Sequence, residues 1–368
     1  MWKALAIACF AFCAVSTARA QTANAVSQFP AVAETELQTG TDLTRQGRFV
    51  DAIPHLLAAR GHVADEYAAD FNLALCYVVT RQPQLAIPIL EELQQEKSGT
   101  AAVWNLSAQA YIGDAQPDKA LQALKRAARI TPDDEKLYSY ISDACVAARN
   151  DALGLKVVDL GLRNVPHSAR LHYERAVFLT ALDRFSQAKR DFRLASQLGR
   201  GTDIGYLSTV HESLIEGDTA ASIRVAQEAV SKGKDNYILL SLLAEALLRS
   251  GVVPGDAGFA EAENVAEKSI NERPDYAPSR ITLGKLYLTD SRFDNAITQL
   301  EAARKLDPQN PAAYANLATA YRRKGDRERE REVLTVLARL NQQQVNTIRD
   351  SGTKTGEHRG NVSSVRNQ

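Results

Sequence analysis

Apolar and polar positions along this chain return in the same order every 34 residues, from Ala33 to Gln344. A period of this length indicates one helical hairpin per unit, and such a hairpin buries its apolar face only by stacking on its neighbours. The pattern places nine units at 33–66, 67–100, 101–134, 135–168, 169–202, 203–236, 237–276, 277–310 and 311–344. We therefore expect function to lie on a stacked surface.

Three positions within the unit fix the register. Position 8 is small in eight of the nine units, position 20 is small in all but the last, and position 24 is apolar throughout. Position 20 reads Ala52, Ala86, Ala120, Gly154, Ala188, Ser222, Ala262, Ala296 and Glu330. Small side chains let two helices approach closely, and a larger apolar residue fills the space beside the crossing. Proline at position 32 ends the second helix in four units, as Pro132, Pro166, Pro274 and Pro308.

The third and eighth units carry the pattern most completely. The third has Trp104, Ala108, Tyr111, Ala120, Leu124, Ala127 and Pro132, and the eighth has Leu283, Gly284, Tyr287, Phe293, Ala296, Leu300, Ala303 and Pro308. With these residues the chain resembles the tetratricopeptide repeat (TPR) family, in an exported bacterial form. The resemblance covers about 312 of the 368 residues. It implies an all-α TPR solenoid, a right-handed superhelix of about nine antiparallel helix pairs, and it implies no particular partner.

The first 20 residues have the layout of a secretory signal peptide. A basic residue near the start precedes an apolar run over 4–15, and an A-x-A box ends at Ala20, before Gln21. A run of about twelve apolar residues is too short to span a bilayer. We expect cleavage between Ala20 and Gln21, a linker over 21–32, and a periplasmic or secreted mature protein without a stable membrane span. The alternative is an uncleaved anchor.

The other end of the chain predicts a cap and a tail. Alternating Arg and Glu over 322–332 give the ninth unit the polar outer face that a terminal repeat needs. Residues 345–368 contain little apolar material, and we expect them to be disordered. The formal charge is zero, from 44 basic and 44 acidic residues. Because no basic stripe is visible, we expect no nucleic-acid partner. The oligomeric state is left open.

No arrangement of residues predicts catalysis, a cofactor or a metal site. The chain lacks a G-x-S-x-G elbow, a Walker loop and a dinucleotide glycine fingerprint. His55 with His62, and His167 with His172, lack the spacing of a zinc pair, and we expect them at solvated helix edges. Cys76 and Cys145 stand two units apart and are expected to be buried thiols beyond disulfide reach. These patterns are not those of an enzyme.

The TPR resemblance implies that positions 2, 5, 9 and 12 of each first helix line a concave face. This predicted stripe lies roughly 130° around the helix from the core positions 4, 7, 8 and 11. The candidate partner-binding residues on it are Phe71, Leu75, Val78, Asn105, Gln109, Ile112, Tyr173, Val177, Leu207, His211, Leu214, Ile238, Ile281 and Lys285. An apolar groove with few polar groups suits a peptide or helix laid along it. The alternative is that these side chains pack between neighbouring first helices.

These observations favour an exported TPR scaffold that binds a protein or peptide along its concave face, within an envelope assembly. The alternative is a non-catalytic accessory or regulatory subunit of an envelope enzyme or of a polysaccharide-export complex. The insertion of the seventh unit, Gly251 to Gly258, is either a binding loop or a tolerated surface insertion. We favour the second because Asp256 is its only charged residue.

Overall fold

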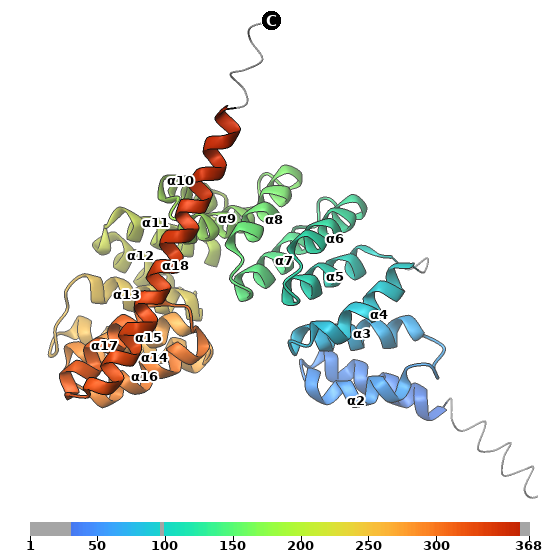
Figure 1. The fold of residues 1–368 in the computed structure, drawn as a ribbon, viewed down its shortest axis with the longest axis horizontal. Coiled ribbons are helices and arrows are strands. Elements are labelled where there is room, and N and C mark those ends of the chain that lie inside the picture. The colour runs from blue at the N-terminus through green and yellow to red at the C-terminus, as the bar shows by residue number, and fades with distance from the viewer. Residues whose placement is uncertain (1–30, 96–98, 361–368) are drawn as a thin grey trace, which may run out of the picture. The chain divides into compact units, whose positions relative to one another are not determined.

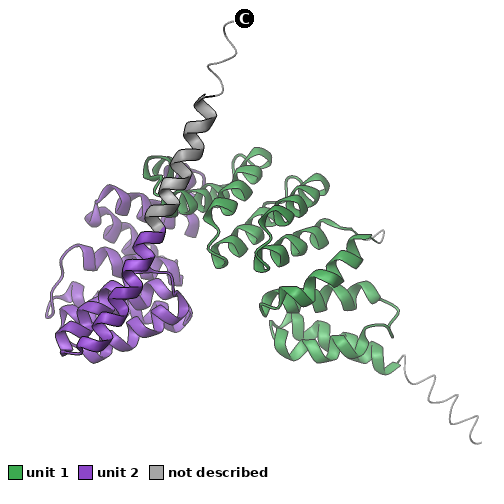
Figure 2. Cartoon of the chain, in the orientation of Figure 1, with its two compact units in different colours: residues 1–191 green, residues 192–368 purple. Residues whose placement is uncertain are grey.

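The computed structural model describes residues 31–95 and 99–360, and all regular structure in that part of the chain is α-helical (Figure 1). The predicted all-α TPR solenoid is confirmed. The chain forms two compact units, each built of several 34-residue repeats, which we call unit 1 (residues 1–191) and unit 2 (residues 192–368) (Figure 2). The boundary between them falls within one helix. The signal segment 1–20, its cleavage site at Ala20 and Gln21, and the linker up to residue 30 lie outside the described residues.

Unit 1 consists of successive helical hairpins. A helix over 31–45 precedes α2. The bounds of the next helices are α2 Phe49–Ala59, α3 Glu66–Val79, α4 Pro83–Gln95, α5 Ala101–Gly113, α6 Pro117–Ile130, α7 Glu135–Ala147, α8 Asp151–Asn164 and α9 Ala169–Ala181. Helix α10, Phe185–Leu198, crosses the boundary between the units. Each helix from α2 to α8 packs on the next, and the first helices also pack on one another, α3 on α5, α5 on α7 and α7 on α9.

Unit 2 repeats this arrangement. Its helices are α11 Asp203–Glu216, α12 Thr219–Ser231, α13 Tyr237–Arg249, α14 Ala257–Glu272, α15 Ala277–Thr289, α16 Phe293–Leu306, α17 Pro311–Lys324 and α18 Arg327–Gly360. The first helices α11, α13, α15 and α17 again pack in order on one another.

In each of the nine 34-residue repeats, the turn between the two helices passes through a residue in the left-handed conformation. That residue stands at position 15, with φ between 54° and 86°, and it is Gly47, Arg81, Ala115, Arg149, Asp183, Gly217, Gly251, Ser291 or Gly325. In eight of the nine units the N–H of position 16 then donates to the carbonyl of position 11, as from Gln116 to Tyr111 at 2.7 Å. This bond closes the last turn of the first helix and reverses the chain.

The small residues predicted at positions 8 and 20 lie where two helices cross closely. Ala120 is 1% exposed. A methyl group on Gly154 would lie 2.3 Å from the ring of Phe178, and one on Gly284 would lie 2.6 Å from Cγ of Leu300. No carbon atom fits at such distances, so the crossings are already packed to contact. The predicted register is confirmed.

A second recurring contact joins one repeat to the next. The carbonyl oxygen of each proline at position 32 accepts a hydrogen bond from the side chain at position 4 of the following repeat. The pairs are Tyr138 with Pro132 at 2.6 Å, His172 with Pro166 at 3.1 Å, Arg280 with Pro274 at 2.9 Å and Tyr314 with Pro308 at 2.8 Å. The carbonyl at a helix end lacks an intrahelical donor, so these bonds satisfy a group that would otherwise need water. His172 is only 6% exposed. The expectation that it lies at a solvated helix edge is therefore wrong.

The ninth unit has a charged residue at the small position 20. The Glu330 carboxylate is 6% exposed and accepts hydrogen bonds from Arg322 at 2.6 Å and Arg327 at 3.0 Å. Helix α18 then continues to Gly360 and thus through most of the segment that we expected to be disordered. No proline stands between 327 and 360, and extending an existing helix costs little compared with starting one. Residues 361–368 lie outside the described residues.

The insertion of the seventh unit forms a short surface loop between α13 and α14. Gly251 and Gly255 have φ of 86° and 99°, and the Asp256 carboxylate accepts a hydrogen bond from the N–H of Val253 at 3.0 Å. Gly258 already belongs to α14, so the loop is shorter than the segment from Gly251 to Gly258. Its tight local bonding agrees with a tolerated insertion.

We expect Ala120→Trp to lower the free energy of unfolding by about 1–3 kcal/mol, because the indole overpacks a close helix crossing. The matched control is Gln122→Trp on the same helix, where the side chain is exposed. It should change the free energy by less than about 0.5 kcal/mol. Urea denaturation followed by circular dichroism measures both variants. Equal midpoints would show that position 20 is not at the crossing.

Candidate functional site

The predicted stripe residues differ in exposure. Six are buried, with 4% to 9% of their surface exposed, and they are Asn105, Ile112, Tyr173, Leu207, Leu214 and Ile281. Eight are partly exposed, and they are Phe71, Leu75, Val78, Gln109, Val177, His211, Ile238 and Lys285. The packing alternative therefore describes the first set, and a binding surface can include the second.

The structure brings six of these residues together in unit 1. Two cavities of about 240 Å³ and 550 Å³ lie along α3, α5 and α7. Phe71, Leu75 and Asn105 line the first, Val78 and Ile112 line the second, and Gln109 lines both. Tyr140 of α7 also lines both, so the two cavities adjoin each other. We call the two cavities together the unit 1 groove.

Apolar side chains dominate the walls of the unit 1 groove. Tyr140 leaves 53% of its surface exposed and Val79 leaves 47%, beside the partly exposed Phe71, Leu75 and Val78. Phe71 stacks on Tyr67 with ring centroids 5.9 Å apart, so the two rings lie in nearly parallel planes along α3. Large apolar side chains held open to solvent along one depression are typical of a surface that a partner covers.

The floor of the groove is a hydrogen-bonded link between two helices. Nδ2 of Asn105 donates to the carbonyl oxygen of Leu137 at 2.7 Å, and Nε2 of Gln109 donates to Oδ1 of Asn105 at the same distance. Asn105 is 6% exposed. Its amide therefore ties α5 to α7, and only Gln109 of this pair is open to a ligand.

Two carboxylates stand at the rim of the groove. Asp134 lines the first cavity and caps the N-terminus of α7, where it accepts a bond from the N–H of Lys136 at 3.1 Å. Asp143 lines the second and lies 3.5 Å from the guanidinium of Arg170. Burial raises the pKa of Asp143, and Arg170 only partly opposes this effect. The groove thus presents an acidic rim, with Arg81 as the basic residue among its lining.

In unit 2 the stripe residues lie on α11, α13 and α15. Leu207, Leu214 and Ile281 are packed inside, whereas Ile238 and Lys285 are partly exposed. The His211 ring stacks on Phe192 with centroids 5.0 Å apart, and burial lowers the pKa of His211 to about 4. This imidazole is therefore neutral at physiological pH. Three of the six stripe residues in unit 2, Leu207, Leu214 and Ile281, thus serve packing.

The sequence reasoning missed Tyr140 and Val79. They stand at positions 6 and 13, one residue beyond positions 5 and 12 of the predicted stripe. Both are large apolar residues outside the core stripe and the concave stripe, and that pattern was the available signal. Among the described residues, no three His, Cys, Asp or Glu side chains gather where they could hold a metal ion. Cys76 and Cys145 are free and buried, as predicted.

Comparisons with known proteins identify the repeats. A tetratricopeptide repeat family model matches residues 37–101 and 281–345, and a second tetratricopeptide repeat model matches 80–142. The chloroplast TPR domain-containing protein PYG7 of Arabidopsis thaliana is 27% identical over 121 residues. The match covers 33% of this chain and 40% of the relative. The chain thus aligns with less than half of that relative's length.

Solved structures share the fold at low identity. A TPR protein from Parabacteroides merdae has a TM-score of 0.52 at 15% identity, with 69% of this chain and 98% of that chain covered. The human IFIT1 dimer with m7Gppp-AAAA has a TM-score of 0.53 at 18% identity, with 73% of this chain and 67% of that chain covered. At these identities the likeness concerns the fold alone.

Asn105→Ala should lower the free energy of unfolding by about 1 kcal/mol, because it removes a buried hydrogen bond between α5 and α7. Gln109→Ala is the matched control. Its partly exposed amide has access to water, so the cost should stay below about 0.5 kcal/mol. Denaturant melts of both variants measure the difference. An Asn105→Ala variant as stable as the wild type would mean that this bond does not support the junction.

Proposed function

We propose that this chain, which carries tetratricopeptide repeats in both of its compact units, is a non-catalytic scaffold that binds a segment of a partner polypeptide in the unit 1 groove. TPR solenoids commonly mediate protein–protein interactions and are generally not catalytic. The observation that carries the proposal is the exposed apolar lining shared by α3, α5 and α7, with Tyr140 joining its two cavities.

The shape of the groove defines the segment that fits it. Three neighbouring first helices with axes about 8–10 Å apart give a length of roughly 20 Å. An extended peptide covers that length with about six residues. Phe71, Val78 and Tyr140 offer apolar contacts along it, and apolar side chains of the segment would anchor there. The free amide edge of Gln109 lies midway and can bond to a peptide backbone.

Charge favours a basic group at the rim of the segment. Asp134 and Asp143 both border the groove, so a Lys or Arg flanking the apolar residues would gain an ion pair there. The same carboxylates disfavour a phosphate backbone. We therefore propose a protein or peptide partner, and no nucleic acid, for this groove.

We further propose that the protein is exported and works in a bacterial envelope assembly. Its support is the layout of residues 1–20, with a short apolar run and an A-x-A box before Gln21. Among the described residues, no helix is both long and apolar enough to cross a membrane.

We expect the mature protein to begin at Gln21. Expression in a bacterium with a general secretion system, followed by N-terminal sequencing of the periplasmic fraction, tests this. The control is Ala18→Asp with Ala20→Asp, which removes the small residues of the cleavage box and should leave the leader attached. Wild-type protein that keeps residues 1–20 in the cytoplasm would contradict export by cleavage.

Phe71→Ser combined with Tyr140→Ser should weaken partner binding at least about tenfold while it changes stability little, because aromatic anchors carry much of a peptide interface. A photo-crosslinking residue at position 140 identifies the bound segment, and the synthetic segment is then titrated by calorimetry. The matched control is Leu85→Ser with Ile130→Ser, two residues 50% and 51% exposed on α4 and α6. This control should bind normally.

Leu207→Ser, at a buried stripe residue of unit 2, shows what the loss of packing does to stability and is compared with the Phe71 and Tyr140 variant. Leu207 is 4% exposed, so the substitution should cost about 2–5 kcal/mol of stability, as large-to-small core changes do. Loss of peptide binding in the control pair, or retention of binding in the Phe71 and Tyr140 variant, would contradict the proposed groove.

A further inference from the structure

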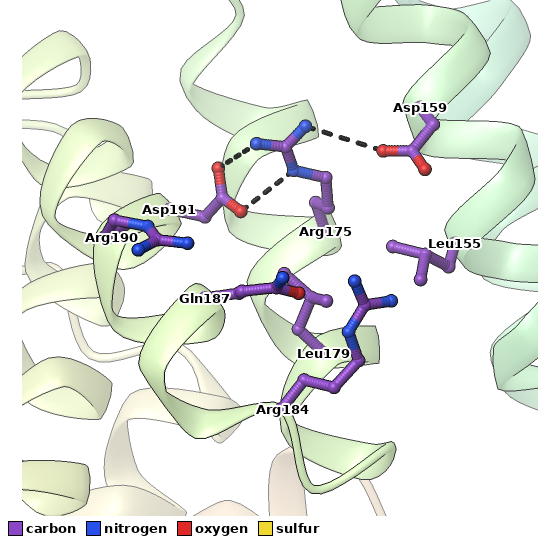
Figure 3. Close-up of a pocket in the computed structure, with 8 residues that line it drawn as sticks. All are labelled: Leu155, Asp159, Arg175, Leu179, Arg184, Gln187, Arg190 and Asp191. Atoms are coloured by element: carbon purple, nitrogen blue, oxygen red, sulfur yellow. Dashed lines mark hydrogen bonds and ion pairs between the residues drawn. The ribbon is translucent and has the colours of Figure 1, made fainter. Parts of the chain in front are cut away.

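Unit 1 contains another cavity, of about 250 Å³, between helices α8, α9 and α10 (Figure 3). None of its lining residues belongs to the unit 1 groove. Leu155 and Leu179 give it apolar walls, and every other residue that lines it is polar or charged. Three of those residues are arginines, Arg175, Arg184 and Arg190.

Arg175 is already fully engaged. Its Nε and Nη2 donate to the two carboxylate oxygens of Asp191 at 2.8 Å and 2.6 Å, and its Nη1 lies 3.4 Å from Asp159. Nδ1 of His172 lies 2.9 Å from the same Asp191, which is 5% exposed. Burial raises the pKa of Asp191, but the bonds from His172 and Arg175 outweigh this and hold it below its usual range. This ionised network forms a fixed wall of the cavity.

Arg184 and Arg190 are available for a ligand. Neither guanidinium has a hydrogen-bond or ion-pair partner within the part of the chain that the structure describes. Figure 3 shows the Arg184 side chain reaching between Leu155 and Leu179, with no contact drawn to it. Each guanidinium carries five N–H donors, and the Gln187 amide adds two more. The cavity therefore has a surplus of donors.

The backbone adds to this positive potential. Helix α10 is 14 residues long and begins at Phe185, directly after Arg184, and Gln187 lies in its first turn. The N-terminal end of a helix attracts anions. Three arginines and two aspartates line the cavity, so its lining has a net charge of plus one.

We propose that this cavity binds the phosphoryl group of a small phosphate monoester. Its free donors come from three residues: Arg184 directly before α10, Gln187 in the first turn of the helix and Arg190 in the second turn. A tetrahedral group with three acceptor oxygens can receive bonds from several directions, whereas one arginine fork satisfies a planar carboxylate. Leu155 and Leu179 then contact the organic part of the ester.

Calorimetric titration of the full chain in a phosphate-free buffer tests the proposal. The probes are phenyl phosphate, inorganic phosphate and benzoate. Phenyl phosphate should bind saturably and more tightly than benzoate. An equal affinity for inorganic phosphate would identify free phosphate as the natural source, and a tighter binding of phenyl phosphate would identify an ester. Benzoate binding as tightly as phenyl phosphate, or no saturable binding of either phosphate, would overturn the proposal.

Two pairs of variants locate the site. Arg184→Gln with Arg190→Gln should weaken phenyl phosphate binding at least about tenfold. Arg126→Gln with Arg129→Gln removes the same charge from exposed positions on α6 and should change affinity less than about twofold. Circular dichroism checks the fold, and Arg190→Gln alone, which leaves the start of α10 intact, repeats the test if the double variant unfolds. Unchanged binding in the Arg184 and Arg190 variants would refute this site.

Discussion

Each hairpin of this chain depends on one backbone conformation at its turn. A positive φ at position 15 reverses the chain in all nine repeats, and in eight of them the N–H of position 16 then reaches the carbonyl of position 11, so that the second helix folds back on the small residues of the first. Five units place a residue other than glycine there, at a cost of about 1–2 kcal/mol each. Local preference alone would not choose this conformation, so the packing of the hairpin must maintain it.

That dependence explains which parts of the fold the sequence could predict. The small residues at positions 8 and 20 and the prolines at position 32 are direct marks of close crossings and helix ends, and the structure places them as predicted. The left-handed residues at Arg81 and Ala115 carry no such mark. Their conformation is imposed by contacts between helices, which no local pattern reports.

The candidate site was predictable to a smaller degree for the same reason. The stripe includes Phe71, Leu75 and Val78, which line the groove, but it also includes Asn105, whose amide donates to the carbonyl of Leu137 in the next repeat. It left out Tyr140 of α7 and Val79 of α3, which each stand one position beyond it, although Asp143 of α7 lies on it at position 9. Helical periodicity gives the face of one helix, whereas the rotation of each helix against its neighbour depends on the packed side chains.

The junction between units has a consequence for how such a chain changes during evolution. The acceptor is the backbone carbonyl of a proline, and the donors are a phenol, an imidazole and a guanidinium. Neighbouring units therefore need no matched pair of side chains at this contact. The fourth and eighth repeats, residues 135–168 and 277–310, each carry a donor at position 4 and an acceptor proline at position 32. A gene duplication that copies either of these repeats would supply both partners of the new junction without a compensating substitution. At these two places the array can thus lengthen by recombination in steps of one whole repeat.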